Sequence, residues 1–501
     1  MTPKGNQSVN KLAKGSYFLI LDNFANLGIG AIFWLVLSKL MDPTVIGQAM
    51  VITGLAVTII GFSGYGIQLA LSKYLPEFII KNMPNSARKI VRGGIKSSLM
   101  ISAVIVVAVA LLAGTISKYA YNDESLTIWM IFIIATFVPT QTVTATLIGA
   151  FQGMHKMSYV AITDFVFQIS RLGFALAAVV LGYGPVGILM SFAVGSFLSL
   201  GVAYLYFLPR ALPKRVEGSE ESEVLSDSKT IAKFTGLNYF SIGMKNMASQ
   251  LGVLILGTQS FEWAAFYGLA YLIAKVVGSF SHSVGSALLP TAAEERTKGN
   301  KEELQRIANI AVRVSILISG FGFILLMIDP TYFLTLISNE YVEAGDALRI
   351  LTVSALINSI AWIMTSLLNA SNRAFDVAKI GLVSAVITIA LTFGLVRIAG
   401  TFEGAAVGWL AGSVFSLIIS LYLLKSKEDL KVSWNSIIRP FVAILSGLLV
   451  GFVFVFYGHT LIGIIASVLC FVGFSLLYKV TSRREIRGMI GVAITKRKRG
   501  Q

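Results

Sequence analysis

The segment GGIKSSLMISAVIVVAVALLAG, residues 93–114, carries one charged side chain and is long enough to cross a bilayer. A helix needs about 20 mostly apolar residues to span the hydrocarbon core, and lipid offers no partner to unpaired backbone groups. Thirteen further stretches along the 501 residues share this character. The fourteen predicted spans are 16–38, 46–70, 93–114, 126–149, 158–181, 186–208, 234–257, 263–290, 307–328, 346–369, 377–399, 404–424, 437–457 and 460–478. The sequence therefore predicts an all-α integral membrane protein.

Basic residues are sorted between alternate loops. With a cytoplasmic N-terminus, the inner segments and adjoining span ends hold 34 of the 41 Lys and Arg. The outer loops hold three basic residues and are mostly acidic. This is the positive-inside pattern. It predicts a multi-pass protein of the cytoplasmic membrane with both termini in the cytoplasm.

The net charge of +16 does not indicate a nucleic-acid partner, because the excess lies in short inner loops and in the tail that includes Lys496–Arg499. Membrane lipid headgroups are the expected partner of such segments. The chain has no Walker loop, its three histidines are isolated, and its single cysteine is Cys470. We expect no metal, no cofactor and no enzymatic activity.

A charged, serine-rich stretch divides the chain, and it is typical of a flexible connector. The predicted parts are an N-lobe of helices 1–6 at 1–208, a cytoplasmic linker at 209–233, a C-lobe of helices 7–12 at 234–424, helices 13–14 at 425–479 and a basic cytoplasmic tail at 480–501.

A weak internal repeat supports this division. Moving residues 66–98 by 217 positions onto 283–315 gives six identities, and two further pairs match lysine with arginine: Lys89 with Arg306, and Lys96 with Arg313. Six helices per half keep the orientation unchanged. The two lobes would then be parallel repeats with a site near the bilayer midplane between them.

Three cations fall near the bilayer centre by residue count: Arg171, Lys245 and Lys275. Charges at this depth are costly and usually face a bundle interior or a wet cavity. We expect them to line a cationic cavity that binds a phosphate, because Arg offers a bidentate fork and Lys a point charge. Asn238 and Asn358 are further candidates for substrate binding.

Four more polar residues are candidates for ion coupling or for lining the cavity. Asp22 and Asn26 share a face of the first predicted helix, and Asp164 shares a face of the fifth with Arg171. Gln141 lies in the fourth predicted helix, beside Pro139. The alternative is that Asp164 and Arg171 form a buried ion network while the two lysines snorkel along their helices. Asp22 and Asn26 would then only pack.

Glycines interrupt the second predicted helix at positions 61, 64 and 66. In membrane helices such residues usually permit close helix packing, and we favour that interpretation here. Pro139 predicts a kink in the fourth helix.

Several segments resemble polysaccharide-export flippases. They are GFSGYGIQLALSKYLPE at 61–77, FQGMHKM at 151–157, GSALLPTAAEE at 285–295, ALRIL at 347–351 and LLNASNR at 367–373. Over residues 10–425 the chain is similar to the multidrug/oligosaccharidyl-lipid/polysaccharide exporter superfamily, in its polysaccharide-biosynthesis, O-antigen-flippase-like branch.

The resemblance implies a transporter that flips a polyprenyl-phosphate- or diphosphate-linked oligosaccharide by alternating access, for export of a surface glycan. Coupling to a proton or Na⁺ gradient is likewise implied, and glycan-assembly enzymes are allowed as partners. Two alternatives stay open. A cation-coupled multidrug antiporter of the same superfamily would need acidic sites for cationic drugs, and a non-transporting scaffold for glycan enzymes would have no reason to keep buried charges.

Overall fold

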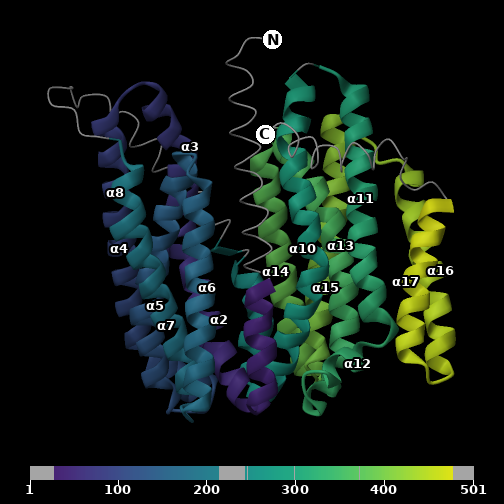
Figure 1. The fold of residues 1–501 in the computed structure, drawn as a ribbon, viewed down its shortest axis with the longest axis horizontal. Helices are drawn as coiled ribbons and strands as arrows, with labels where there is room; N and C mark the ends of the chain where they lie inside the picture. Colours follow the sequence, from purple (N-terminus) through teal and green to yellow (C-terminus); the bar gives the residue numbers. More distant parts are fainter. Residues whose placement is uncertain (1–27, 214–242, 245, 298, 372, 478–501) are drawn as a thin grey trace, which may run out of the picture. The chain divides into compact units, whose positions relative to one another are not determined.

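The computed structural model describes residues 28–213, 243–244, 246–297, 299–371 and 373–477. Within these residues the secondary structure is helical, and they contain no strand. The main helices are α2 (Pro43–Ser63), α3 (Tyr65–Ile80), α4 (Pro84–Thr115), α5 (Leu126–Gly153), α6 (Met157–Val180), α7 (Gly184–Gly201), α10 (Phe261–Thr297), α11 (Lys301–Ile328), α13 (Gly345–Ala370), α14 (Ala374–Ala399), α15 (Glu403–Glu428), α16 (Trp434–Phe456) and α17 (Thr460–Leu477) (Figure 1). Shorter elements are α8 (Leu208–Ala211), α12 (Pro330–Thr335), the π-helical turns Ile116–Ala120 and Val202–Phe207, and the 3-10 turn Asn339–Ala344.

The fourteen predicted spans all overlap apolar helices. Twelve helical segments of the described residues are long and apolar enough to cross a membrane. The first and seventh predicted spans correspond to the shorter apolar helices Gly28–Leu40 and Asn246–Gly257. The predicted all-α membrane fold is confirmed. The predicted lobe boundaries remain a prediction. Residues 214–233 of the predicted linker and the predicted tail lie outside the described residues.

Local sequence explains where several helices begin. Pro43 and Pro84 are the first residues of α2 and α4, positions where a missing N–H is harmless and a fixed φ favours the helix. At α11 the side chain of Asn300 accepts a hydrogen bond from the backbone N–H of Glu303. Gly182, at φ +81°, makes the tight turn between α6 and α7.

The predicted glycine break is present, since α2 ends at Ser63 and α3 begins at Tyr65. A Cβ on Gly61 would lie 2.8 Å from the Asn246 side chain, and one on Gly64 would lie 3.2 Å from the Thr142 backbone. The glycines therefore permit close helix packing, as expected. Pro139 lies inside the continuous helix α5, and the predicted kink there stays a prediction.

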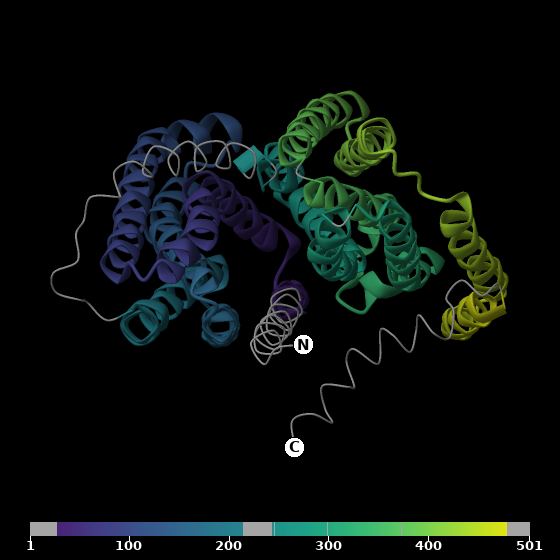
Figure 2. The same ribbon diagram turned by 90° about the horizontal axis from the view of Figure 1, so that it is seen from above.

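The chain forms two compact units. Unit 1 contains residues 1–269 and 381–405, and unit 2 contains residues 270–380 and 406–501. In unit 1, α5 packs against α2, α3, α4 and α7, and α6 packs against α7. In unit 2, α11 packs against α13, α16 and α17. The last two helices run side by side in both ribbon views (Figure 2).

Buried hydroxyl groups join neighbouring helices in each unit. In unit 1, Ser98 of α4 and Thr146 of α5 lie 2.5 Å apart between their hydroxyl oxygens. In unit 2, four serines of α10, α11 and α13 form a hydrogen-bonded cluster, with oxygen–oxygen distances of 2.7–2.9 Å: Ser281, Ser315, Ser319 and Ser359. Such polar contacts stabilise helix association in lipid, where the hydrophobic effect does not favour contact between helices.

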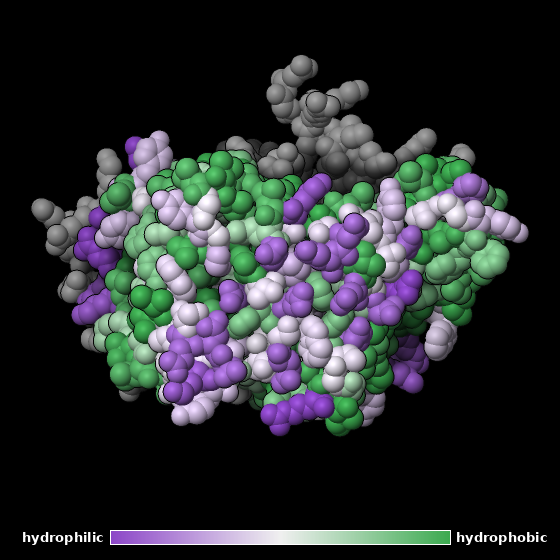
Figure 3. Space-filling model, turned by 90° about the horizontal axis from the view of Figure 1, so that it is seen from below, coloured by the Kyte–Doolittle hydropathy of each residue, from purple (hydrophilic) through white to green (hydrophobic). Residues whose placement is uncertain are grey.

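The flanks of the helices carry large apolar side chains that are exposed in the structure, among them Val104 and Leu111 of α4. On the end of the molecule that Figure 3 views, hydrophilic residues gather across the face, while its left and right margins are mostly hydrophobic. This is the distribution expected of helices whose flanks meet lipid.

Candidate functional site

Arg171 of α6 lies in a cage of aromatic rings within unit 1. Its side chain is buried, with the residue 6% exposed. The guanidinium carbon lies 4.1 Å from the ring centre of Phe33, 4.7 Å from that of Phe192 and 5.2 Å from that of Phe167. The guanidinium nitrogen Nη2 donates a hydrogen bond to Gln168 Oε1 at 2.8 Å. Ring faces are negative, so they stabilise a cation that has lost its water.

The cage is assembled from three helices. Phe167, Gln168 and Arg171 share one face of α6 because their spacings are three and four residues. Phe192 comes from α7, and Gly195 lets that helix approach: a Cβ there would lie 3.1 Å from Arg171 Cβ. Phe33 comes from the helix Gly28–Leu40 and packs edge-on against Phe192. The rings fix the position of the charge.

The alternative, a buried ion network of Asp164 and Arg171, stays a prediction. The structure records no ion pair between the described residues Asp164 and Arg171, although Asp164 makes other polar contacts. Among the described residues, the bond to Gln168 is the one hydrogen bond recorded for Arg171, and its buried Nε atom has none. A guanidinium has five donors. Whether an anion reaches the other donors of this buried group stays a prediction.

Lys275 of α10, in unit 2, is exposed. Its Nζ lies 5.9 Å from the ring centre of Tyr271, one turn earlier, and Tyr271 in turn packs edge-on against Trp409 of α15 at 5.3 Å. Of the predicted cations that the structure describes, Arg171 in unit 1 is caged and Lys275 in unit 2 is exposed. Whether the two act on one ligand stays a prediction.

The remaining predicted residues are placed as follows. Asn358 of α13 and Gln141 of α5 are half-buried, as is Asp164. One turn after Asn358, the Trp362 ring lies 4.1 Å from that of His282. Four predicted residues lie outside the described residues: Asp22, Asn26, Asn238 and Lys245.

The aromatic cage was not predicted from the sequence. The spacing of Phe167 and Arg171 is a readable signal, since residues four apart on a helix are neighbours. Phe33 and Phe192 come from other helices, and no local pattern connects them to Arg171.

Comparison with known proteins identifies the family. The model of the family described as polysaccharide biosynthesis protein matches residues 12–295. The chain belongs to this family. A second model, MatE, matches residues 246–393. The two matches place the chain in the multidrug/oligosaccharidyl-lipid/polysaccharide exporter superfamily, in its polysaccharide-biosynthesis branch, as the resemblance indicated.

Individual relatives agree with this assignment. The chain is 23% identical to an uncharacterised membrane protein of Methanocaldococcus jannaschii, over 82% of this chain and 95% of that protein. It is also 23% identical to the lipid II flippase MurJ of Bacillus subtilis, over 83% of each. Relatives with a named activity are transporters or flippases. They support a transporter rather than an enzyme.

Solved structures share the fold. A lipid II flippase MurJ in an inward closed conformation aligns with a TM-score of 0.68, at 14% identity, over 93% of this chain and 98% of that one. An inward-facing multidrug resistance MATE family transporter aligns with a TM-score of 0.61, at 12% identity, over 81% of this chain and 94% of that one.

Proposed function

We propose that this protein flips a lipid-linked oligosaccharide, carried on a polyprenyl phosphate or diphosphate, across the cytoplasmic membrane by alternating access. The observation that carries the proposal is the family match over residues 12–295, to proteins of polysaccharide biosynthesis. The similarity to a lipid II flippase over 93% of the chain supports a substrate with a lipid tail and a phosphate.

The chemistry of Arg171 suits a phosphate. A phosphate drawn from the headgroup zone toward the midplane loses its water, and a cation in a low-dielectric site must replace that hydration. The cage of Phe33, Phe167 and Phe192 holds the guanidinium in place before the phosphate arrives, so little reorganisation is needed. Lys275 adds a mobile point charge, and Lys245 would add another.

Transport is coupled, in this proposal, to a proton or Na⁺ gradient. The residues proposed for coupling are Asp22, Asn26, Asp164 and Gln141. The substrate's oligosaccharide meets Asn238 and Asn358. Glycan-assembly enzymes deliver the substrate on the cytoplasmic side.

A multidrug antiporter is the second candidate, favoured by the MatE match and by the shared fold with a MATE transporter. Two observations weigh against it. The alignment to that transporter covers 81% of the chain, compared with 93% for the flippase. The predicted cavity residues described here include a caged arginine and an exposed lysine, which would repel a cationic drug.

Reconstituted vesicles distinguish the candidates. A polyprenyl-diphosphate oligosaccharide with a fluorescent glycan is placed in both leaflets, and a membrane-impermeant reductant then destroys the accessible fluorophore. A flippase exposes the inner pool with time, whereas protein-free vesicles lose only the outer-leaflet signal. Parallel vesicles measure uptake of a cationic dye under a proton or Na⁺ gradient. Dye transport without glycan flipping would establish the antiporter instead.

Variants of the two described cations test the phosphate chemistry. Arg171→Ala and Lys275→Ala should each slow flipping by about tenfold or more, equivalent to about 1.4 kcal/mol in the barrier. Arg171→Lys should recover part of the rate, because the charge returns without the fork. The matched control is Arg349→Ala, which removes an exposed arginine paired with Asp346 at 2.8 Å. Parental rates in both alanine variants would rule out this role for the two cations.

A further inference from the structure

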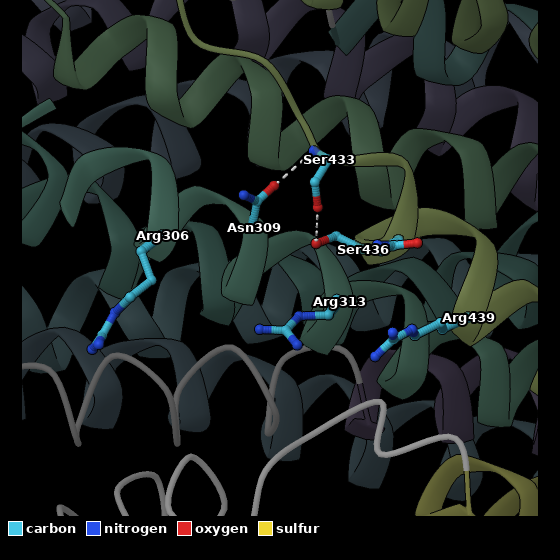
Figure 4. A pocket seen from close by; sticks show the side chains of 7 residues that line it. Arg306, Asn309, Arg313, Ser433, Ser436 and Arg439 are labelled. Atoms are coloured by element: carbon cyan, nitrogen blue, oxygen red, sulfur yellow. Dashed lines mark hydrogen bonds between the residues drawn. The ribbon is translucent and has the colours of Figure 1, made fainter. Parts of the chain in front are cut away.

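A basic pocket of about 240 Å³ lies in unit 2, between the starts of α11 and α16 (Figure 4). Its lining contains three arginines and no carboxylate. The lining residues are Arg306, Asn309 and Arg313 of α11, Ser433, and Asn435, Ser436 and Arg439 of α16. None of these residues belongs to the predicted cavity.

Hydrogen bonds hold the two walls of this pocket together. Asn309 Oδ1 accepts the backbone N–H of Ser433 at 2.9 Å, as the dashed line in Figure 4 shows. One turn earlier, Gln305 Oε1 accepts the backbone N–H of Lys431 at 2.9 Å, and the Gln305 amide donates to the Lys431 carbonyl. The segment that leads into α16 is therefore held along α11 by bonds within the protein.

Charge in the pocket favours an anion. Arg306 and Arg313 are seven residues apart, two turns along one face of α11, with Asn309 between them. Arg439 faces them from α16. Glu303 pairs with Arg306 at 3.2 Å, and because the Arg306 side chain is 70% exposed, solvent screens this pair.

The start of α16 adds a second source of positive potential. The hydroxyl of Ser433 lies 2.7 Å from that of Ser436, and no side chain caps the backbone N–H groups of the first turn. These N–H groups carry the positive end of the helix dipole, which attracts anions such as phosphate. Asn435 and Ser436 of this turn line the same pocket as the three arginines.

The pocket lies near the starts of two candidate membrane spans, α11 and α16. Its walls are the second to fourth turns of α11 and residues 433–439 at the start of α16. Trp434, the first residue of α16, is 76% exposed, and Ile438, one turn later, is also exposed. Tryptophan is enriched where the hydrocarbon core meets the headgroups. The arginines therefore meet a layer that is rich in phosphate.

We propose that this pocket binds the phosphate group of an anionic ligand at the membrane interface. The phosphate belongs to a lipid headgroup or to a soluble ion, and both would be held by the forks of three arginines and the first turn of α16. The site does not depend on the identity of the transported substrate.

Lipid binding is measured on the purified full-length protein by native mass spectrometry, with phosphatidic acid added to neutral detergent. The variant R306Q/R313Q/R439Q should bind the lipid about tenfold less tightly than the parent, since several charge-assisted bonds are lost. The matched control is K89Q/R92Q/K96Q. It also removes three positive charges, but from exposed positions on α4, of which Lys89 and Lys96 pair with Arg306 and Arg313 in the repeat. The control should lose less than about twofold.

A second arm separates the two sources of phosphate. Thermal unfolding is followed in sodium phosphate and in sodium chloride at equal ionic strength. Loss of lipid binding in the pocket variant alone supports a lipid headgroup, and loss of phosphate-specific stabilisation in that variant alone supports a soluble ion. If the pocket variant and the control variant lose binding equally, the anion is attracted by general positive charge and not by the pocket. If the pocket variant loses neither lipid binding nor phosphate-specific stabilisation, the pocket binds no phosphate. Either result overturns the proposal.

Misfolding is checked with R306K/R313K/R439K. This variant keeps the charge and should recover part of the binding, because lysine lacks the bidentate fork. Full recovery would mean that charge alone suffices and would overturn the role of the arginine forks. None of these readouts requires flipping, so a failed transport assay and an empty pocket are separate results.

Discussion

Helices α4 and α11 occupy matching places in the sequence repeat but have different surroundings. Each follows a basic loop, and a shift of 217 residues superposes their first halves. Of the most apolar window of α4, 11% is buried, compared with 50% for α11. α16 and α17 pack on α11, whereas the main neighbours of α4 among the described residues are α2, α3 and α5.

The basic residues of α11, which α16 and α17 cover, have different surroundings from those of α4. Lys89 and Lys96 of α4 are exposed, and a lysine ammonium suits an interface where it can stay hydrated. Their partners in the repeat, Arg306 and Arg313, line the walls of a pocket. Arginine suits a fixed site because its planar fork matches carboxylate and phosphate geometry. Equivalent positions in a repeat thus have different surroundings when further helices pack on only one of the two.

The largest effect is expected when a bulky side chain is introduced on α11, and the same change on α4 serves for comparison. A Cβ on Gly320 of α11 would lie 2.6 Å from Ile444 of α16, whereas a Cβ on Gly93 of α4 meets nothing within 4 Å. Gly320→Leu should therefore destabilise the protein by about 1–3 kcal/mol through overpacking. Gly93→Leu should stay within about 0.5 kcal/mol of the parent. Both are measured by thermal unfolding in detergent, and equal midpoints would show that α16 does not cover α11.

A smaller effect is expected from the paired serines of the repeat. Ser315 belongs to the four-serine cluster of unit 2, while its partner Ser98 contacts a single threonine hydroxyl. Ser98→Ala should cost about 0.6 kcal/mol, the average for such bonds in membranes, and Ser315→Ala up to about 1.7 kcal/mol. Unfolding in denaturant measures the difference. A larger cost at Ser98 would mean that the cluster is not cooperative.

The smallest effect is expected at the far end of α4. Lys118 forms an ion pair with Glu124 at 2.9 Å, and both side chains are more than half exposed. Solvent and salt screen such pairs. Lys118→Ala should leave the unfolding midpoint unchanged within error at any salt concentration. A drop that disappears at high salt would reveal a stabilising pair and would weaken the view of α4 as an uncovered helix with loosely held charges.

The spans were predictable because hydrophobic length is a local property. The apolar length of residues 93–114 predicts a membrane helix without reference to any other segment. The position of Pro139 inside a helix was predicted from local sequence in the same way, and it lies inside α5. The position of Arg171 inside a membrane-spanning helix was also predictable, because it follows from counting along one apolar segment.

The surroundings of the charges were not predictable from a single sequence. Phe33 and Phe192 reach Arg171 from helices on either side of it in the chain. Arg439 joins Arg306 and Arg313 across more than a hundred residues, and their basic character alone predicted only an inner loop. Packing between distant helices leaves no spacing signal that could be read.

The attachment of α16 to α11 has a consequence for how the protein is made. Ser433 follows Arg313 by 120 residues. At about 5–20 residues per second, a ribosome needs roughly 6–24 s to synthesise the intervening chain. During that interval α11 stands in the membrane without the helix that completes its pocket, and its arginines meet the headgroups of the surrounding bilayer. The newly made α16 then docks on a surface that lipid has already had time to occupy.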